Sequence, residues 1–219
     1  IFFWVARMIM FGMEFQNKEP FKNIYVHALV RDEKGQKMSK SKGNVIDPLE
    51  LIEKYSADAL RFTLLSMASP GRDVKLSEDR VKGYRNFLNK IWNANNFLIQ
   101  NDCKFENIET PNDLKLNINK WIFVEFTNTN EKIKKSIDSY RFDEAARIAY
   151  QFVWHSFCDW YLELSKTVFY SENNENIEET RNVASFIFTQ ILVILHPFIP
   201  FLTEEIWLKN KLDKDGKDF

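Results

Sequence analysis

The chain has 219 residues, a formal net charge of -1, 45% hydrophobic residues and 20 phenylalanines. This composition excludes intrinsic disorder for the chain as a whole and supplies enough apolar residues for about one and a half to two globular domains. Because the net charge is nearly zero, local basic patches would have to bind any nucleic-acid partner.

The two cysteines, Cys103 and Cys158, lack metal-ligand spacing, so we expect reduced thiols and a cytoplasmic type of compartment. No apolar run has transmembrane length, and the N-terminus lacks the features of a signal peptide. The chain begins with Ile1 instead of Met and ends in the charged run 213–219. We therefore expect an internal piece of a longer protein.

Apolar side chains recur at helical spacing from residue 2 to residue 15, including Phe2, Val5, Ile9 and Met13. Further apolar residues widen this stripe, and the predicted helix is therefore one that belongs inside a larger domain. For Trp4, core packing is the ordinary interpretation.

Residues 24–30 form a β-rich run with little alternation, which favours a parallel strand covered on both faces. This strand would be the last of a dinucleotide-type sheet, and such sheets bind ligands at the carboxyl ends of their strands. His27, inside this run, is either a core histidine or a contact to a nucleotide.

A lysine-rich run, Lys37–Asn44, follows the turn at residues 33–36 and is called here the lysine loop. It carries three ammonium groups, two serine hydroxyls and Gly43. Lysine is a compact, mobile charge, and hydroxyl and backbone N–H groups add fixed donors, so this pattern suits a polyphosphate. A solvated surface loop is the alternative interpretation.

Two short helices are predicted after the lysine loop. The first runs from Asp47-Pro48 to about Tyr55, with proline at the first helical position. Ser56 is expected to cap the second, residues 57–67, which ends before Ser69-Pro70-Gly71.

From Ser77 onward the pattern changes to long amphipathic helices. Apolar periodicity predicts helices over 77–100, 118–137, 148–168 and 179–195, the last ended by Pro197 and Pro200, and a fifth starting at Thr203. In the third, Trp160, Tyr161 and Leu164 are among the residues that mark the apolar face. Polar loops at 101–113 and 171–176 separate these helices, so a helical bundle is expected.

Several motifs resemble those of the class I aminoacyl-tRNA synthetases, in order and in spacing, and within that class those of the valine-specific enzymes. Lys37-Met38-Ser39-Lys40-Ser41 matches the signature loop of the class. The other matching segments are Phe2–Met8, Tyr25-Val26-His27, Asp47-Pro48-Leu49, Asp58–Phe62, Asn89–Ala94 and His196–Trp207.

This resemblance implies a mainly α fold. Residues 1–70 would be the C-terminal end of a Rossmann-type α/β catalytic domain, and residues 71–219 an anticodon-binding helical bundle, truncated at its C-terminus. Lys37 and Lys40 would be catalytic, and Met38, Ser39, Ser41 and His27 would join them in binding ATP. Ala28 stands where the family usually has glycine, which weakens the assignment of His27.

The resemblance also implies that Trp4 borders the amino-acid pocket. For tRNA, it implies phosphate contacts from Lys82, Arg85, Lys132 and Lys135, with Lys90, Lys134 and Arg141 as further candidates. Trp154 or Tyr161 could stack on an anticodon base, although core packing is the commoner role of such residues.

The implied activity is that of a valine–tRNA ligase: ATP-dependent activation of valine, with Mg²⁺, and transfer to tRNA(Val). The His-x-Gly-His motif of the class and its editing insertion are absent, so the 219 residues alone are expected to be inactive. We expect no membrane partner, and we expect the protein to be a monomer. An isoleucine- or leucine-specific synthetase and a non-catalytic tRNA-binding module remain alternatives.

Overall fold

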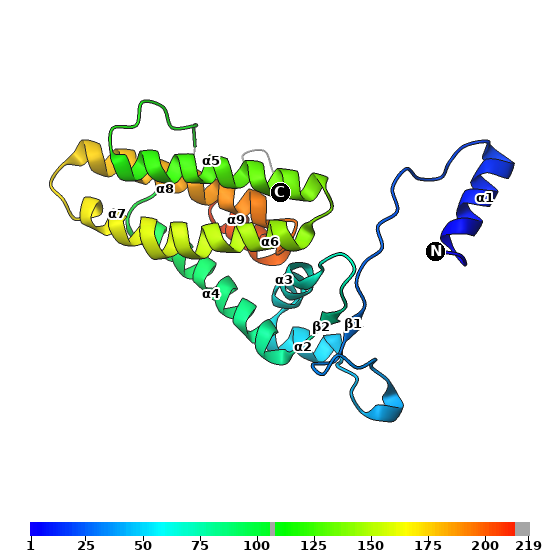
Figure 1. The fold of residues 1–219 in the computed structure, drawn as a ribbon. Helices are drawn as coiled ribbons and strands as arrows, with labels where there is room; N and C mark the ends of the chain where they lie inside the picture. The colour runs from blue at the N-terminus through cyan, green and yellow to red at the C-terminus, as the bar shows by residue number, and fades with distance from the viewer. Residues whose placement is uncertain (106–107, 213–219) are drawn as a thin grey trace.

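The computed structural model describes residues 1–105 and 108–212. Long helices form a bundle, two shorter helices pack beneath it, and an N-terminal helix stands apart on an extended segment (Figure 1). In this described part, no helix has both the length and the apolar content needed to cross a membrane.

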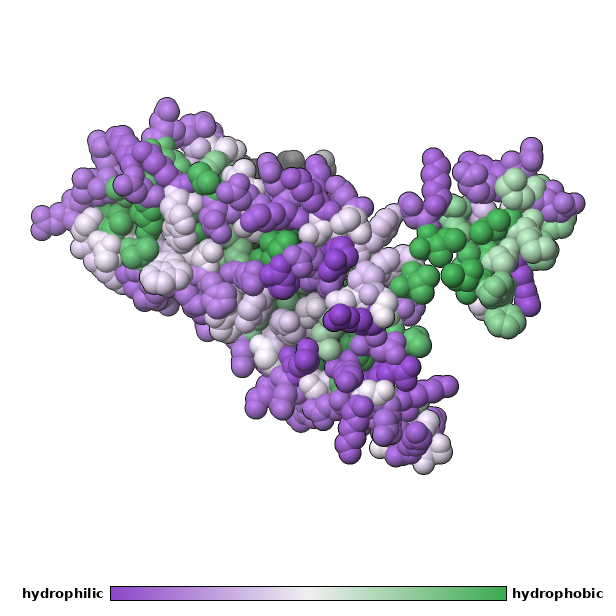
Figure 2. All heavy atoms as spheres, viewed as in Figure 1, coloured by the Kyte–Doolittle hydropathy of each residue, from purple (hydrophilic) through white to green (hydrophobic). Residues whose placement is uncertain are grey.

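The N-terminal helix α1 (Val5–Gln16) confirms the helix predicted over residues 2–15. It ends where Asn17 adopts a left-handed backbone conformation, with φ of 48°. None of its residues is buried, and the large side chains before and along it are exposed. Hydrophobic residues gather over this region in Figure 2. Helix α1 therefore leaves an apolar surface exposed in the described part of the chain.

The prediction of a covered strand over residues 24–30 is wrong for most of its length. Only β1 (Val30–Arg31) forms, and it pairs in parallel with β2 (Val74–Lys75), with Val30 opposite Val74. Val26 is 64% exposed. A central strand needs a neighbour on each side, and within residues 1–105 and 108–212 the only sheet is this two-stranded one.

Helices α2 (Pro48–Tyr55) and α3 (Ala57–Met67) confirm the predicted bounds, and α3 confirms the predicted cap at Ser56; α2 has a side-chain cap as well, at Asp47. The Asp47 side chain accepts from the Leu49 N–H at 2.9 Å, and the Ser56 hydroxyl accepts from the Ala59 N–H at 3.3 Å. The bond at Ser56 joins residues only three positions apart, which is why the local sequence pattern could predict it.

The predicted bundle is confirmed. Its elements are α4 (Glu78–Gln100), α5 (Asn117–Asp138), α6 (Phe142–Gln151), a π-helical segment (Phe152–Tyr161), α7 (Leu162–Phe169), α8 (Asn174–Leu195) and α9 (Pro200–Lys209). The fifth predicted helix begins three residues earlier than expected. Pro200 starts it, because a first-turn residue needs no backbone N–H.

The π-helical segment changes which residues of the third predicted helix face the core. Trp160 was placed on the apolar face but is 62% exposed, and Leu164 is also exposed, whereas Tyr161 is fully buried. A π-helix closes its hydrogen bonds over five residues instead of four, so a stripe counted at 3.6 residues per turn drifts out of register.

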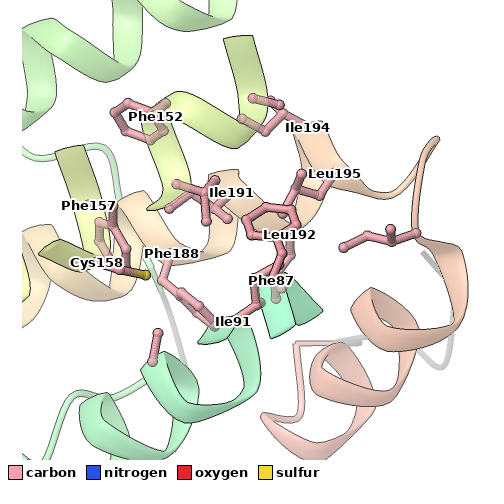
Figure 3. Packing of buried hydrophobic residues seen from close by; sticks show 14 of the residues in the cluster. Phe87, Ile91, Phe152, Phe157, Cys158, Phe188, Ile191, Leu192, Ile194 and Leu195 are labelled. Carbon is pink, nitrogen blue, oxygen red and sulfur yellow. The ribbon is translucent and has the colours of Figure 1, made fainter. Parts of the chain in front are cut away.

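The core lies where α4, the π-helical segment and α8 meet. In Figure 3, Ile91 of α4 lies beside Phe188 of α8, and Phe87 of α4 lies beside Leu192. Phe157 of the π-helical segment packs on Phe188, with ring centres 6.1 Å apart. The same hydrophobic cluster continues into α2 and α3 through Leu51, Ala59 and Phe62. Because this core crosses residue 70, the connector helices pack as part of the bundle, and the division of the chain at that residue stays a prediction.

Candidate functional site

The lysine loop is attached to the rest of the molecule on both sides. Before it, the Val74 N–H donates to the Leu29 carbonyl at 2.8 Å, the Leu76 N–H donates to the Arg31 carbonyl at 3.1 Å, and Arg31 pairs with Asp73. After it, the chain passes directly into α2. Figure 2 shows a hydrophilic surface over this end of the molecule.

A tight turn at residues 32–36 leads into the lysine loop. Asp32 organises it: its carbonyl accepts from the Gly35 N–H at 2.9 Å, and its carboxylate accepts from the Gln36 N–H at 2.6 Å. Gly35 has φ of 77°, a conformation that glycine adopts without strain. The turn thereby fixes the direction in which the lysine loop leaves the β1–β2 pair.

Asn44 closes the lysine loop from its far end. The Asn44 amide oxygen accepts from the Ser39 N–H at 2.9 Å, and its amide nitrogen donates to the Asp32 carboxylate at 2.7 Å and to the Lys37 carbonyl at 3.3 Å. The Asn44 amide, followed by the Gln36 N–H, lowers the pKa of Asp32. Sequence reasoning assigned no role to Asn44 or Asp32, because both act across several residues.

The lysine side chains themselves point outward. Lys37, Lys40 and Lys42 are exposed. Residues Lys40–Lys42 form a short 3-10 turn, and the Ser39 and Ser41 hydroxyl oxygens lie 3.3 Å apart. Gly43 ends the turn with φ of 65° and open space around it. The arrangement presents mobile cations on a backbone held by Asn44, which suits an anionic ligand bound from solvent.

Two predicted site residues are not brought to the lysine loop. Trp4 precedes α1 and is exposed, and α1 lies far from the loop in Figure 1. His27 is exposed on the extended segment, with Nδ1 2.8 Å from the carbonyl oxygen of Ala28. The core packing expected of Trp4 and His27 is wrong, because both side chains are exposed in the described part of the chain. The ligand contacts that the resemblance implies for them stay predictions.

The basic residues predicted to contact tRNA lie in two groups. Lys82 and Arg85 are exposed on the first half of α4, whereas Lys132 and Lys135 are exposed near the end of α5. Figure 1 shows these two helix halves well apart. Lys134 is exposed beside the α5 pair. A ligand that contacts both groups at once has to be extended.

Two other candidate tRNA-contacting residues, Lys90 and Trp154, make contacts within the protein itself. Lys90 pairs with Asp159, and its ammonium group lies 4.2 Å from the centre of the Trp154 ring. Trp154 also stacks on Tyr150, with ring centres 5.5 Å apart. These contacts favour packing over base stacking for Trp154.

Arg141 and Tyr161 are likewise engaged within the bundle. The Arg141 guanidinium donates two hydrogen bonds to the Asp143 carboxylate, at 3.0 and 3.1 Å. Tyr161 is fully buried, its hydroxyl donates to Asn119 Oδ1 at 3.0 Å, and burial raises its pKa. The suggestion that Tyr161 stacks on a base is wrong, because no base can reach a side chain that is sealed in the core.

The sequence matches two family models, which together cover most of the chain. Residues 1–77 match tRNA synthetases class I (I, L, M and V), and residues 119–218 match the anticodon-binding domain of tRNA ligase. The chain therefore belongs to the class I aminoacyl-tRNA synthetases, which confirms the resemblance drawn from its motifs.

Within that class, the chain is similar to valine–tRNA ligases along its whole length. It is 73% identical over 219 residues to the valine–tRNA ligase of Pelagibacter ubique (strain HTCC1062), and 55% identical over 210 residues to that of Mesorhizobium japonicum. The alignments cover 100% and 96% of the chain but only 25% and 23% of the relatives. The chain thus spans about a quarter of their length.

Solved structures support the fold. A leucyl-tRNA synthetase, Agrobacterium radiobacter K84 agnB2 LeuRS, in a ternary complex with tRNA and LeuAMS, has a TM-score of 0.71 at 20% identity and covers 94% of the chain and 24% of its own. Mycobacterium tuberculosis methionyl-tRNA synthetase in complex with methionyl-adenylate has a TM-score of 0.67 at 19% identity. That match covers 84% of the present chain and 37% of the methionyl-tRNA synthetase chain. At these identities the likeness shows a shared fold.

Proposed function

We propose that the chain supplies the phosphate-contacting loop and the tRNA-contacting helices of an ATP-dependent valine–tRNA ligase. The single observation that carries the proposal is the exposed lysine loop, fixed by Asn44, in a chain 73% identical to such an enzyme. A module that only bound tRNA would have no need of the Lys37–Ser41 sequence of the class I signature loop.

In the proposed reaction, a carboxylate oxygen of valine attacks the α-phosphorus of ATP. A bond from the carboxylate to phosphorus forms, the bond to the β-phosphate oxygen breaks, and pyrophosphate leaves. A ribose hydroxyl at the 3′ end of tRNA then attacks the valyl carbonyl carbon. The ester bond forms, the bond to phosphate breaks, and AMP leaves while the hydroxyl proton passes to solvent.

The lysine loop would stabilise the negative charge that builds up on the phosphates in the first step. We assign the Lys40 ammonium group to the departing pyrophosphate and Lys37 to the neighbouring phosphate oxygens. Ser39 and Ser41 would donate hydrogen bonds in the closed loop. Preorganised charge of this kind acts mainly on the transition state, so the chemistry needs no nucleophile from this chain.

Mg²⁺ would enter as a complex with the phosphates of ATP. Among residues 1–105 and 108–212, no group of three or more His, Cys, Asp or Glu side chains could hold a metal ion. The donors at the loop are lysines and hydroxyls, which suit phosphate oxygens and not a cation. When bound, the ion would neutralise phosphate charge that the lysines also face.

The substrate tRNA would be tRNA(Val), with Lys82, Arg85, Lys132 and Lys135 contacting its phosphates. Two separated basic groups on a protein of net charge -1 fit an extended polyanion better than a small ligand.

We place the protein in the reducing cytoplasm and expect a monomer. Cys103 and Cys158 are buried free thiols, and burial raises the pKa of each to about 12. A buried, protonated thiol is unreactive, which is compatible with a reducing compartment.

The test is amino-acid-dependent exchange of pyrophosphate into ATP by the full-length protein, followed by charging of tRNA(Val). We expect exchange with valine to exceed exchange with isoleucine or leucine. Exchange driven mainly by isoleucine or leucine would favour the synthetases of those amino acids. Absence of exchange with all three would leave only a tRNA-binding module.

A further inference from the structure

Two of the sequence motifs that the proposed chemistry does not use meet each other in the structure. One is Asp58–Phe62 in the first turns of α3, and the other is His196–Trp207, which spans the turn between α8 and α9. More than 130 residues separate these segments in the chain, as the separation of 143 residues between Asp58 and Phe201 illustrates.

Asp58 caps α9 from a different helix. Its side chain is 3% exposed, and its carboxylate accepts from the Leu202 N–H at 2.7 Å and from the Phe201 N–H at 3.4 Å. These N–H groups belong to the first turn of α9, where no carbonyl of the helix itself can satisfy them. Burial raises the pKa of Asp58 although both N–H groups oppose the shift. A carboxylate kept at such a buried position ties α3 and α9 together with directional bonds.

Arg61, one turn further along α3, binds the same turn from its other side. Its Nη2 donates to the Pro197 carbonyl at 3.1 Å, and its Nε donates to the Phe198 carbonyl at 3.3 Å. Within the turn, His196 Nδ1 lies 2.9 Å from Thr203 Oγ1. We call the four bonds made by Asp58 and Arg61 the α3–α9 clasp.

The far end of α3 is also attached to the bundle. The Ser69 hydroxyl donates to the Asp143 carboxylate at 2.7 Å, just where α6 begins. Helix α3 is therefore fixed at both ends. It is also linked to the lysine loop twice, through α2 on one side and through the β1–β2 pair on the other.

From these contacts we infer that Asp58 and Arg61 are positioning residues that fix the lysine loop relative to the tRNA-contacting bundle, and that they govern the transfer step more than the activation step. The inference rests on the proposed function. Activation involves only small substrates at the catalytic domain. Transfer also requires that a tRNA held by the bundle presents its 3′ end at the right place, and a displacement of about 1 Å can lower a rate about 100-fold.

The test compares both steps in the full-length protein carrying Asp58→Ala or Arg61→Ala. We expect pyrophosphate exchange within about threefold of the unchanged enzyme, and single-turnover transfer from preformed valyl-adenylate to tRNA lowered about 10- to 100-fold. Arg61→Lys, which keeps a cationic donor for one carbonyl, should recover part of the transfer rate. Thermal melts establish that each variant is folded.

Two control variants use matched substitutions. Asp79→Ala removes an exposed carboxylate from α4, and Arg147→Ala removes an arginine whose hydrogen bonds, to Glu144 and Gln151, stay within α6. Both should leave the ratio of transfer to exchange unchanged.

Equal loss of exchange and transfer in a folded variant, or loss of neither, would overturn the inference while leaving the proposed function in place. If Asp58→Ala does not fold, Asp58→Asn and Arg61→Lys decide by the same ratio, because the amide oxygen still accepts one N–H. If the unchanged enzyme gives no valine-dependent exchange, the proposed function and this inference fall together.

Discussion

At the scale of single residues, substitution of Lys40 is the most direct test of the proposed chemistry. Its ammonium group projects from the 3-10 turn into solvent, so shortening the Lys40 side chain to alanine removes a charge with little effect on packing. We predict that Lys40→Ala in the full-length enzyme lowers valine-dependent pyrophosphate exchange by about 100- to 1000-fold, the usual effect of losing one preorganised charge-stabilising donor. Equilibrium binding of valine should change far less, since valine carries no phosphate.

Lys34→Ala is the matched control for Lys40, because Lys34 is an exposed lysine in the preceding turn. It should retain exchange within about twofold. Similar losses in the two variants would mean that general positive charge, and not the placement of Lys40, assists the reaction.

Asn44 gives a second prediction at this scale. Its amide makes two hydrogen bonds within the lysine loop and one to Asp32 in the preceding turn, and it contributes no charge. Asn44→Ala should therefore raise the KM for ATP and lower kcat together, by about tenfold overall, because the lysines lose their fixed backbone. Steady-state exchange kinetics measure both constants, and amide hydrogen exchange of residues 37–44 should become faster. If activity fell while the rate of amide hydrogen exchange of residues 37–44 stayed the same, this explanation would be contradicted.

At the scale of secondary-structure elements, a buried polar cluster fixes the register of three helical segments. Asn119 of α5 accepts from the Tyr161 hydroxyl and donates to Glu179 and Thr180 of α8. Tyr161→Phe leaves the Asn119 oxygen without that donor in the core. We predict a loss of about 1 to 3 kcal/mol in the free energy of unfolding, measured by urea denaturation. Tyr170→Phe, at an exposed tyrosine, should cost less than about 0.5 kcal/mol.

The junction between α3 and α6 makes stability depend on pH. Hydrogen bonds from Arg141 hold the pKa of Asp143 below its ordinary value, with a further contribution from Ser69. The folded protein therefore binds this proton less tightly than the unfolded chain. The resulting stability is fully present above about pH 4, the unfolded value, and is lost as the pH falls toward the lower folded value.

Asp143→Asn should show this dependence directly. We predict that the variant is about 1 to 2 kcal/mol less stable at pH 7 and that its stability declines less steeply with acid than that of the unchanged chain. Urea denaturation between pH 7 and pH 3.5 measures both effects. Asp138→Asn, at an exposed position on α5, is the control. Parallel pH curves for Asp143→Asn and the unchanged chain would refute the assignment.

The same elements show how far sequence reasoning extends. The cap at Ser56 was predictable because donor and acceptor lie within a few residues, and the bundle was predictable from periodicity over long windows. Asn44 and Asp58 were not, because their partners lie 5 to 144 residues away and nothing local marks them. Trp160 was misplaced because the π-helical turns leave no distinct signal in hydrophobic spacing.

At the scale of the whole molecule, apolar and polar surfaces are segregated. The bundle and its connector share one core, whereas α1 and the residues before it present large apolar side chains to solvent (Figure 2). Phe2, for example, is 87% exposed. A surface of this kind normally marks an interface, and the rest of the catalytic domain in the proposed full-length enzyme is the partner that fits it.

This segregation predicts independent behaviour of the two parts within the 219-residue chain. Because α1 buries no residue, its amides should exchange with solvent far faster than those of α8, whose core residues include Ile187, Ile191 and Leu192. Removing residues 1–28 should change the free energy of unfolding by less than about 0.5 kcal/mol and should reduce aggregation. In the full-length enzyme, by contrast, α1 should be protected from exchange. Slow exchange of α1 in the 219-residue chain would show that it already packs against the bundle, contrary to the arrangement in Figure 1.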